Sequence, residues 1–438
     1  MSIDKYLKNI KNKINKDNDN RINKKINKNN KINNFNNENN NYNSNSNNLN
    51  NSFNHFNFKI NTTIDEYDVV IIGAGPIGCI TGENIKNGKV LIVEEHNAIG
   101  VPLQCAGIIS KKGVKELGNP KGCVNTVRGA HIYSKNQHIQ IGNEEIRAYI
   151  FERKIMDKDI GIRAVKNKNI DIWLKSYGKV KDNKDECGVS IVKMGKNYNL
   201  NPKIIVGADG AKSTVGKSLN LVNKREILSG AQIEFVNVNN IDDDFVYIFC
   251  DRDYCEDFFI WIIPMGKDRV RVGLCDNGNT YNKLINFVNN HPIGSKLLKN
   301  AIPVEFSVGT LPIGYSKTVY KNVLLVGDSA GHVKPLSGGG LYYGAKCAKI
   351  CGKVIDEYLL NKDKKVLKEY EKKWKNLIKR EIDFGLRFRK ILKKMDNRQY
   401  DKLLKFINDY NLTEFINKYG DMDSPSIVVK KVFKECML

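Results

Sequence analysis

The stretch YDVVIIGAGPIG, residues 67–78, decides the fold. A buried-strand run at 67–72 leads into a Gly-x-Gly-x-x-Gly turn and a helix expected to end near Lys86. A second strand at 90–93 ends at Glu94, which completes one βαβ unit within about 30 residues. Glycines at 73, 75 and 78 let backbone amides approach a pyrophosphate, and Glu94 is placed to accept hydrogen bonds from ribose hydroxyls. The unit predicts a dinucleotide-binding domain, without separating FAD from NAD.

The first 63 residues differ in composition from the rest, since 24 of the first 60 are Asn. Their few apolar residues have no sustained period, so we expect a disordered tail. The net charge of +23 is spread over the tail and the remainder, and it favours anionic partners in general. An AT-rich genome that favours Lys, Asn and Ile codons explains the same composition.

The ten cysteines show no C-x-x-C pair and no accompanying His cluster, so we expect neither a zinc site nor an iron–sulfur cluster. Scattered thiols suit a reducing cytoplasm. The longest apolar runs, such as 258–265, are much shorter than a membrane span requires. We therefore expect a cytoplasmic protein that contacts the inner face of the membrane at most peripherally.

Further strand and turn signals follow along the chain. A helix-like stretch at 153–168 precedes a hairpin region and the strand and turn at 204–210. Alternating strands between 229 and 276 predict a separate antiparallel sheet. A late strand, 323–326, runs into Gly327-Asp328, and helices follow from about 339 to 360 and on to about Tyr410.

Two of these turns resolve the choice of nucleotide by resemblance. The segments GADG, residues 207–210, with Ser213, and LVGDSAG, residues 325–331, resemble the paired motifs of the flavoprotein superfamily that contains aromatic hydroxylases and isoprenoid reductases. The resemblance implies that Asp328 holds the ribityl chain of FAD. A helix N-terminus directed at the flavin pyrimidine would favour the anionic reduced flavin.

Within that superfamily, three further segments resemble the geranylgeranyl reductase family: GVPLQCAG at 100–107, FER at 151–153, and HVKPLSGGGL at 332–341. The similarity extends over roughly 67 to 410. The resemblance, together with the glycine turn, implies a set of cofactor-binding residues. They are Gly73, Gly75, Pro76, Ile77, Gly78, Glu94, Cys105, Ala106, Arg153, Asp328, Gly340 and Leu341. For Arg153, the start of a surface helix is an alternative reading.

Members of this family saturate isolated trisubstituted double bonds of geranylgeranyl chains. Such an alkene is unactivated, so hydride transfer from reduced flavin must be accompanied by protonation in a dry, apolar groove. Cys105 is the candidate catalytic residue beside the flavin, although a small buried thiol fits the same position.

The expected substrate contacts are Phe259, Trp261 and Pro264. The family pattern P-x-x-Y-x-W-x-F-P aligns here with Glu256, Phe259, Trp261, Ile263 and Pro264, so only the Trp and the final Pro are retained. The loop around Cys105 also lacks the Glu common in the family. These aromatic residues could instead be sheet core.

The resemblance implies a polyprenyl lipid substrate, with NAD(P)H or a reduced carrier such as ferredoxin as electron donor. The basic C-terminal helices, which carry apolar residues among Lys and Arg, suit an anionic membrane surface. A nucleic-acid partner is not expected, because the Asn-rich tail has few aromatic residues and no known module.

We therefore predict an α/β protein with a Rossmann-like FAD-binding domain of the aromatic-hydroxylase type, an inserted antiparallel sheet and a helical C-terminal region. The expected units are a disordered tail (1–63), FAD-binding segments (64–228 and 306–360), a substrate sheet (229–305) and a helical cap (361–438). The predicted function is FAD-dependent reduction of isoprenoid double bonds on archaeal-type ether phospholipids. An FAD-dependent hydroxylase and a flavin electron carrier without lipid turnover are the alternatives.

Overall fold

The computed structural model describes residues 66–222, 225–428 and 431. The predicted tail at 1–63 therefore lies outside the described residues.

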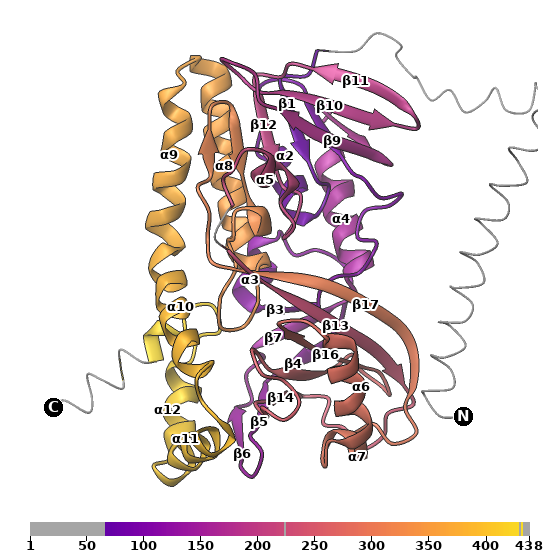
Figure 1. Ribbon diagram of the computed structural model, residues 1–438, viewed down its shortest axis with the longest axis vertical. Helices are drawn as coiled ribbons and strands as arrows, with labels where there is room; N and C mark the ends of the chain where they lie inside the picture. Colours follow the sequence, from indigo (N-terminus) through magenta and orange to yellow (C-terminus); the bar gives the residue numbers. More distant parts are fainter. Residues whose placement is uncertain (1–65, 223–224, 429–430, 432–438) are drawn as a thin grey trace, which may run out of the picture. The chain divides into compact units, whose positions relative to one another are not determined.

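A six-stranded sheet has the strand order β18-β19-β12-β1-β2-β8 (Figure 1). Four of its pairings are parallel, and β18 is antiparallel to β19. The strands are β1 (Val69–Ile72), β2 (Val90–Val93), β8 (Ile170–Trp173), β12 (Ile204–Gly207), β18 (Val319–Tyr320) and β19 (Val323–Leu325). The βαβ unit expected from 67–94 thus lies at the centre of this sheet.

Alternate residues of β1 face two different layers, as the strand period of two requires. Val69 and Ile71 pack in the cluster formed with α2 (Pro76–Glu83), α4 (Arg153–Val165) and α8 (Leu341–Asn361). Val70 and Ile72 pack instead against a three-stranded antiparallel sheet. That sheet consists of β9 (Ser176–Lys181), β10 (Gly188–Lys193) and β11 (Lys196–Leu200). Both faces of the parallel sheet are therefore covered, which explains its continuous apolar strands.

A second large sheet has seven strands in the order β17-β13-β16-β15-β14-β5-β6. All its pairings are antiparallel except that of β14 with β5. The strands are β5 (Gly129–Tyr133), β6 (His138–Gly142), β13 (Glu226–Val236), β14 (Phe245–Phe249), β15 (Ile260–Pro264), β16 (Val270–Asp276) and β17 (Ile302–Ile313). Helix α6 (Thr280–Asn290) contacts β13 and β16, and the short α7 (Gly294–Leu297) contacts α6.

This sheet is larger than the segment 229–305 that the sequence analysis assigned to it. Strands β5 and β6 belong to it although they lie within the segment 64–228, and β17 continues to Ile313. The local strand pattern did not show this because β14 pairs with β5 across more than a hundred residues of intervening chain.

A small three-stranded sheet is formed by residues between 108 and 151, in the order β3-β7-β4. It consists of β3 (Ile108–Ser110), β4 (Cys123–Val127) and β7 (Ala148–Phe151). Three short helical segments complete this part: α3 (Lys111–Glu116), α5 (Thr214–Ser218) and the 3₁₀ turn η2 (Gly327–Ser329).

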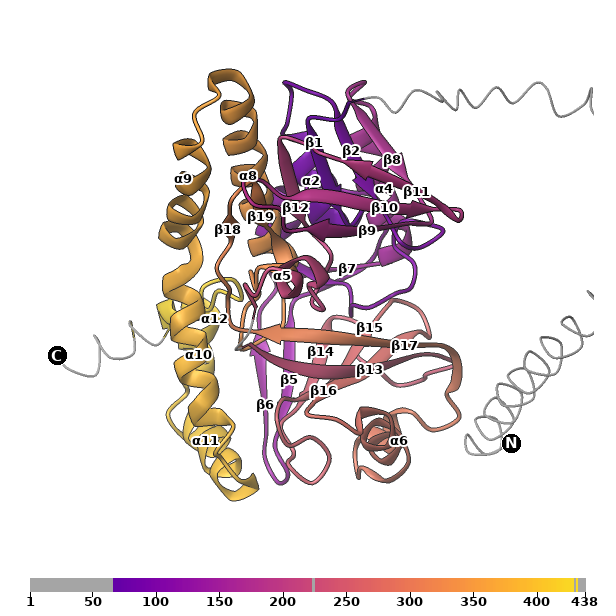
Figure 2. The same ribbon diagram turned by 45° about the horizontal axis from the view of Figure 1, so that its top comes forward.

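The C-terminal part is helical, with α9 (Lys365–Trp374), a π-helical turn η3 (Lys375–Lys379), α10 (Arg380–Leu392), α11 (Asn397–Asp409) and α12 (Leu412–Tyr419). Figures 1 and 2 both show α9, α10 and α11 as a column beside the two large sheets. Helix α12 continues the helical cap expected at 361–438 past Tyr410.

Candidate flavin and substrate site

The glycine turn between β1 and α2 is shaped by close backbone contacts. Gly73 has φ +108°, and a Cβ there would lie 2.3 Å from the Ala208 carbonyl oxygen. A Cβ on Gly78 would lie 2.0 Å from the Gly73 oxygen, so neither position admits a side chain. Gly75, the N-cap of α2, has no atom within 4 Å of its Cβ position. The turn is thus closed toward the protein and open at Gly75, as the approach of a phosphate to a helix N-terminus requires.

Glu94 lies directly beside this turn. One carboxylate oxygen, Oε2, accepts a hydrogen bond from the Ala74 backbone N–H at 2.9 Å. The other, Oε1, accepts from the His96 backbone N–H and lies 2.6 Å from His96 Nδ1. The buried Glu94 carboxylate, directly after the end of β2, therefore lies where a ribose can be bound. His96 had no sequence signal that separated it from an ordinary loop histidine.

The segment that begins at Gly327 packs directly on the glycine turn at 73–78. Gly327 and Gly344 each leave room for Ile77, since a Cβ on either would lie within 3.0 Å of that side chain. A Cβ on Gly340, the N-cap of α8, would lie 2.6 Å from Asp328 Oδ1. The structure thus brings Ile77, Asp328 and Gly340 together. Burial raises the pKa of Asp328, although Arg225 and Arg153 act in the opposite direction.

Arg153 is the first residue of α4, and its guanidinium is largely buried. Its Nε and Nη2 atoms donate to the two carboxylate oxygens of Asp157 at 2.8 Å, with the side chains 11% and 8% exposed. Burial lowers the pKa of Arg153, but Asp157 and then Cys105 raise it, and the net direction is upward. Cys105 therefore lies close to this guanidinium. Ala106 follows it in the loop that leads to β3.

Arg271 on β16 joins the loops to the seven-stranded sheet, and its side chain is 0% exposed. Its guanidinium donates to the carbonyl oxygens of Ala106 at 3.3 Å and Phe151 at 3.0 Å. It also donates to Glu152 Oε2 at 2.8 Å and to Glu234 Oε2 at 3.1 Å. One side chain therefore holds two of the segments for which the sequence predicted flavin contacts, the one with Ala106 and the one that leads to Arg153. The sequence analysis missed it because a single Arg within a strand does not show that it is buried.

Trp261 on β15 packs against Gly273, its partner on β16. A Cβ on Gly273 would lie 2.6 Å from Trp261 Cζ2, and the indole Nε1 donates to Gln232 Oε1 at 3.2 Å. The Phe259 ring lies 6.2 Å from that of Trp261 and stacks on Phe258 at 4.3 Å. The sheet thus presents two of the three predicted substrate residues together.

Pro264 is separated from these two residues. Successive side chains of a strand point to opposite faces, so Pro264 on β15 faces away from the side that carries Phe259 and Trp261. It is buried and pairs with Val270.

His332 lies beneath the late motif and is fully buried. Its Nδ1 accepts a hydrogen bond from the Gly327 backbone N–H at 3.3 Å, so the neutral ring carries its proton on Nε2. Burial, and then the charge of Arg225, lower its pKa to about 3. The ring lies 4.7 Å from that of Trp374 on α9. Sequence reasoning placed His332 within a motif but gave it no role.

Asp423 fixes the glycine-rich loop 332–341 from the C-terminal end of the described chain. Its carboxylate accepts from Lys334 Nζ at 2.9 Å and from Ser110 Oγ at 2.6 Å, and its carbonyl accepts from the Tyr343 hydroxyl at 2.7 Å. Lys334 in turn packs against Gly339, because a Cβ on that glycine would lie 2.8 Å from Lys334 Cε. No sequence signal pointed to Asp423.

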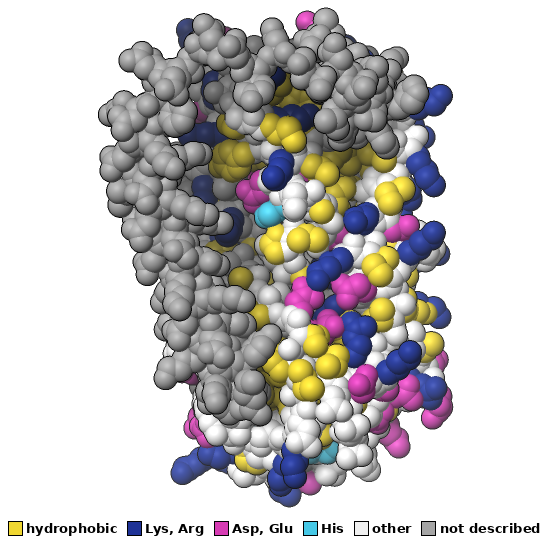
Figure 3. All heavy atoms as spheres, turned by 90° about the vertical axis from the view of Figure 1, so that its right-hand side faces the viewer, with side chains coloured by type: hydrophobic (Ala, Val, Ile, Leu, Met, Phe, Trp, Pro, Cys, Tyr) yellow, Lys and Arg dark blue, Asp and Glu magenta, His cyan; other side chains and the backbone are white. Residues whose placement is uncertain are grey.

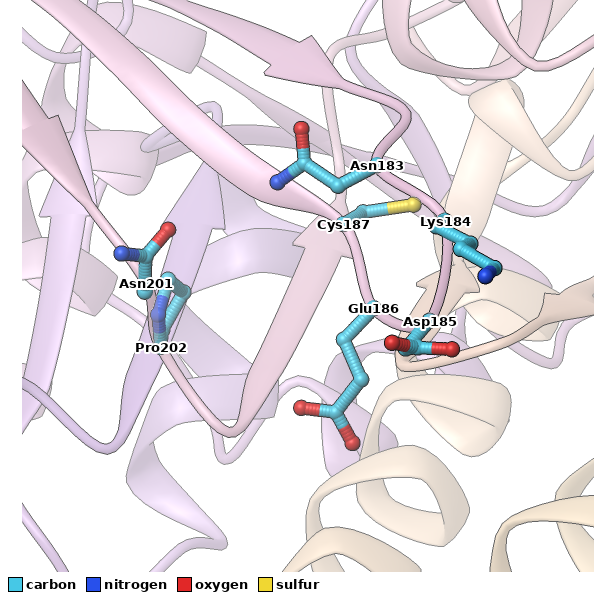
Figure 4. Close-up of a pocket in the computed structure, with 7 residues that line it drawn as sticks. All are labelled: Asn183, Lys184, Asp185, Glu186, Cys187, Asn201 and Pro202. Carbon is cyan, nitrogen blue, oxygen red and sulfur yellow. The ribbon is translucent and has the colours of Figure 1, made fainter.

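One cavity carries none of the predicted site residues. A cavity of ≈ 390 Å³ is lined by residues 183–187, 201 and 202 (Figure 4). The face in Figure 3 carries apolar side chains interspersed with cations and anions. Among the described residues, no cluster of three or more His, Cys, Asp or Glu side chains could hold a metal ion. No helix in the described part of the chain is long and apolar enough to cross a membrane.

The open glycine turn, the acid beside it and the late aspartate fit FAD, and comparison with known proteins agrees. A family model described as an FAD binding domain matches residues 66–281. The chain is an FAD-dependent oxidoreductase.

Relatives define the family further. A digeranylgeranylglycerophospholipid reductase of Methanocaldococcus jannaschii is 30% identical over 392 residues, which cover 85% of this chain and 99% of the relative. An uncharacterised protein of the same organism is 62% identical over 373 residues, 84% of this chain and 95% of the relative. A solved structure of a geranylgeranyl bacteriochlorophyll reductase-like protein from Thermoplasma acidophilum has a TM-score of 0.73 at 23% identity, and covers 84% of this chain and 99% of that one. The chain belongs to the geranylgeranyl reductase family.

Proposed function

We propose that the protein saturates the isoprenoid double bonds of geranylgeranyl chains, on ether phospholipids of the archaeal type. The relative from M. jannaschii and a 32% identical one from Methanococcus vannielii are both digeranylgeranylglycerophospholipid reductases. The observation that carries the proposal is the sheet face with Phe259 and Trp261, which Arg271 joins to the loop containing Cys105 and Ala106. An isoprenoid chain can react with the flavin only where an apolar surface lies beside the flavin, and the face with Phe259 and Trp261 is the proposed surface.

The chemistry demands a hydride and a proton for each double bond. Bound FAD, when reduced, supplies the hydride. The protein must hold the alkene in an apolar groove from which water is excluded, and Phe259 and Trp261 contribute the aromatic surface. Cys105 is half-buried beside Arg153 and is our candidate for the proton donor.

Twelve residues form the proposed cofactor site. The turn holds the pyrophosphate, Glu94 the ribose and Asp328 the ribityl chain, while the remaining residues border the flavin. They are Gly73, Gly75, Pro76, Ile77, Gly78, Glu94, Cys105, Ala106, Arg153, Asp328, Gly340 and Leu341. For the substrate we retain Phe259 and Trp261, and we assign Pro264 to the support of the strand.

We propose NAD(P)H or a reduced carrier such as ferredoxin as electron donor. We also propose that the protein acts while bound to an anionic membrane surface. The proposed units remain the FAD-binding segments, the substrate sheet and the helical cap.

The test is anaerobic incubation of the flavin-loaded protein with a digeranylgeranylglycerol phospholipid and a strong reductant. We expect products heavier by two hydrogens for each reduced bond, measured by mass spectrometry. Reduced flavin that persists unchanged with every polyprenyl lipid offered would refute the proposal. Rapid NAD(P)H oxidation coupled to aromatic hydroxylation in air would favour a hydroxylase instead.

Cys105 has a separate test within the same assay. Cys105→Ser keeps a weak proton donor at the position, whereas Cys105→Ala removes it. We expect the Ala variant to lose more turnover than the Ser variant, with equal rates of flavin reduction. Equal turnover of both variants and the wild type would exclude Cys105 as the donor.

A further inference from the structure

A basic pocket lies where the π-helical turn η3 joins α10. Its volume is ≈ 430 Å³, and it is lined by four cations, one carboxylate and an aromatic ring, together with Ser426. The cations are Lys375, Lys379, Arg380 and Arg387, the carboxylate is Asp383, and the ring is Phe384. Single π-helical turns within α-helices are frequent at functional sites. We call this feature the basic pocket.

The charges of the basic pocket are only partly neutralised. Lys375 pairs with Glu371, and Lys379 pairs with Asp383, each one helical turn away. For Arg380 and Arg387, both exposed, the described part of the chain provides no ion pair or hydrogen bond. Two guanidinium groups therefore remain available at the pocket, and a guanidinium matches the geometry of phosphate oxygens.

Apolar side chains accompany these cations on the same helical segments. Leu377 is 42% exposed and Ile391 is 59% exposed. The Phe384 and Phe388 rings stack at 5.9 Å between them and are half-buried. A helical surface that mixes cations with exposed apolar and aromatic residues is typical of helices that lie in a membrane interface.

The opposite face of α10 lies against the predicted substrate region. A Cβ on Gly385 would lie 2.9 Å from Pro335, so the helix packs directly on the glycine-rich loop. Arg389 donates to the Asp257 carbonyl oxygen at 2.9 Å, and its guanidinium lies 5.3 Å from the Phe258 ring. One helix, about 10 Å across, therefore separates the basic pocket from the segment that carries Phe259 and Trp261.

From this arrangement we infer that the basic pocket binds the phosphate of an anionic lipid headgroup in a bilayer and so docks α10 on the membrane. A docked α10 leaves only this helix between the bilayer and the segment that carries Phe259 and Trp261. The inference rests on the proposed function, because a polyprenyl phospholipid is supplied from a bilayer. It adds a defined headgroup site to that function.

The experiment measures binding of the full flavin-loaded chain to vesicles by sedimentation. The probes are phosphatidylglycerol vesicles, phosphatidylcholine vesicles as the uncharged comparison, and inorganic phosphate as competitor. The test variant is Arg380→Gln with Arg387→Gln. The matched control is Lys372→Gln with Lys373→Gln, two exposed cations on α9 outside the pocket.

We expect wild-type protein to bind phosphatidylglycerol vesicles more tightly than phosphatidylcholine vesicles. The Arg variant should bind them about thirtyfold more weakly, which is the contribution of two basic side chains near an anionic surface. The control variant should lose much less, because its cations are not in the pocket. Melting temperatures of both variants, compared with wild type, confirm that the fold is retained.

Any of four results would overturn the inference. Equal losses in the two variants would indicate diffuse charge attraction. Absence of wild-type binding to anionic vesicles would exclude the lipid site. An Arg variant whose vesicle binding is unchanged, but which no longer binds an acidic carrier protein, would indicate a protein-docking surface. Competition by millimolar phosphate without vesicle selectivity would indicate a site for the free ion. Lipid reduction by the wild type in detergent is measured separately, so failure of the proposed function is distinguishable from failure of this site.

Discussion

Replacing Arg271 by Met would test whether one buried guanidinium holds the loops of the proposed flavin site. The side chain donates to two carboxylates, those of Glu152 and Glu234, and to two backbone carbonyls. Met keeps most of the volume and removes all of these contacts. The two carboxylates remain close together and poorly solvated, so we expect the folded state to be destabilised.

The magnitude follows from what is left behind. Removing one partner of a buried ion pair costs about 3–5 kcal/mol. Arg269 remains 2.6 Å from Glu234 and 4.0 Å from Glu152, so it compensates part of the loss. We therefore expect the lower end of that range, about 3 kcal/mol. Arg271→Lys keeps the charge but not the planar fork, and should cost about 1–2 kcal/mol.

The assay is denaturant unfolding of the apo-protein, with a fluorescence titration of FAD. Arg269→Met is the matched control, because that side chain is 37% exposed and its pairs should contribute less than about 1 kcal/mol. Arg271→Met should also weaken FAD binding, since the carbonyls of Ala106 and Phe151 lose their anchor. An Arg271→Met protein as stable as the Arg269→Met protein, with FAD affinity unchanged, would refute the reasoning.

Three further changes test other parts of the site. Gly75→Ala should leave the unfolding free energy of the apo-protein within about 0.5 kcal/mol of wild type, because its Cβ position is open, yet should weaken FAD binding in a fluorescence titration. Unchanged FAD affinity would argue against a pyrophosphate at this turn. The pKa of His332 is about 3 in the folded state, against an ordinary 6.5, so on acidification the unfolded state takes up the proton first. Stability is therefore full above about pH 6.5 and falls toward pH 3, by about 2 kcal/mol between pH 7 and pH 5; His332→Gln should flatten that part of the unfolding profile, and an equally steep variant would contradict the assignment. Gly273→Ala should displace Trp261, whose ring lies 2.6 Å from the added carbon, and raise KM for the lipid without altering the flavin spectrum; an unchanged KM would remove Trp261 from the proposed substrate groove.

The central βαβ unit was predictable because its signals are local. Strand, glycine turn and helix all lie within 67–94, and the position of Glu94 follows from the end of the second strand. The identity of the cofactor needed a second signal, Asp328, which depended on resemblance. The contact of Gly327 with Ile77 is the physical link between the two.

Long-range pairings explain what the sequence did not show. Strand β5 pairs with β14, and Asp423 binds Lys334, although nothing near either residue in the chain indicates its partner. Arg271 is a similar case, since its burial depends on Glu152 and Glu234 from other strands and loops. The position of Pro264 differs from these, because the alternation along β15 already places it opposite Trp261.

The hydrogen bonds of Asp423 have a consequence for the order in which the protein is made. A ribosome delivers the chain from its N-terminus, and segments begin to fold as they emerge. Strands β1 and β2 are made early, but β19 joins their sheet only after residue 323 has been added. The loop 332–341 gains its last anchor later still, when Asp423 reaches Lys334 and Ser110. Assembly of the proposed flavin site is therefore completed only after Asp423 has been added, and a nascent chain stalled before that point would expose an unfinished pocket.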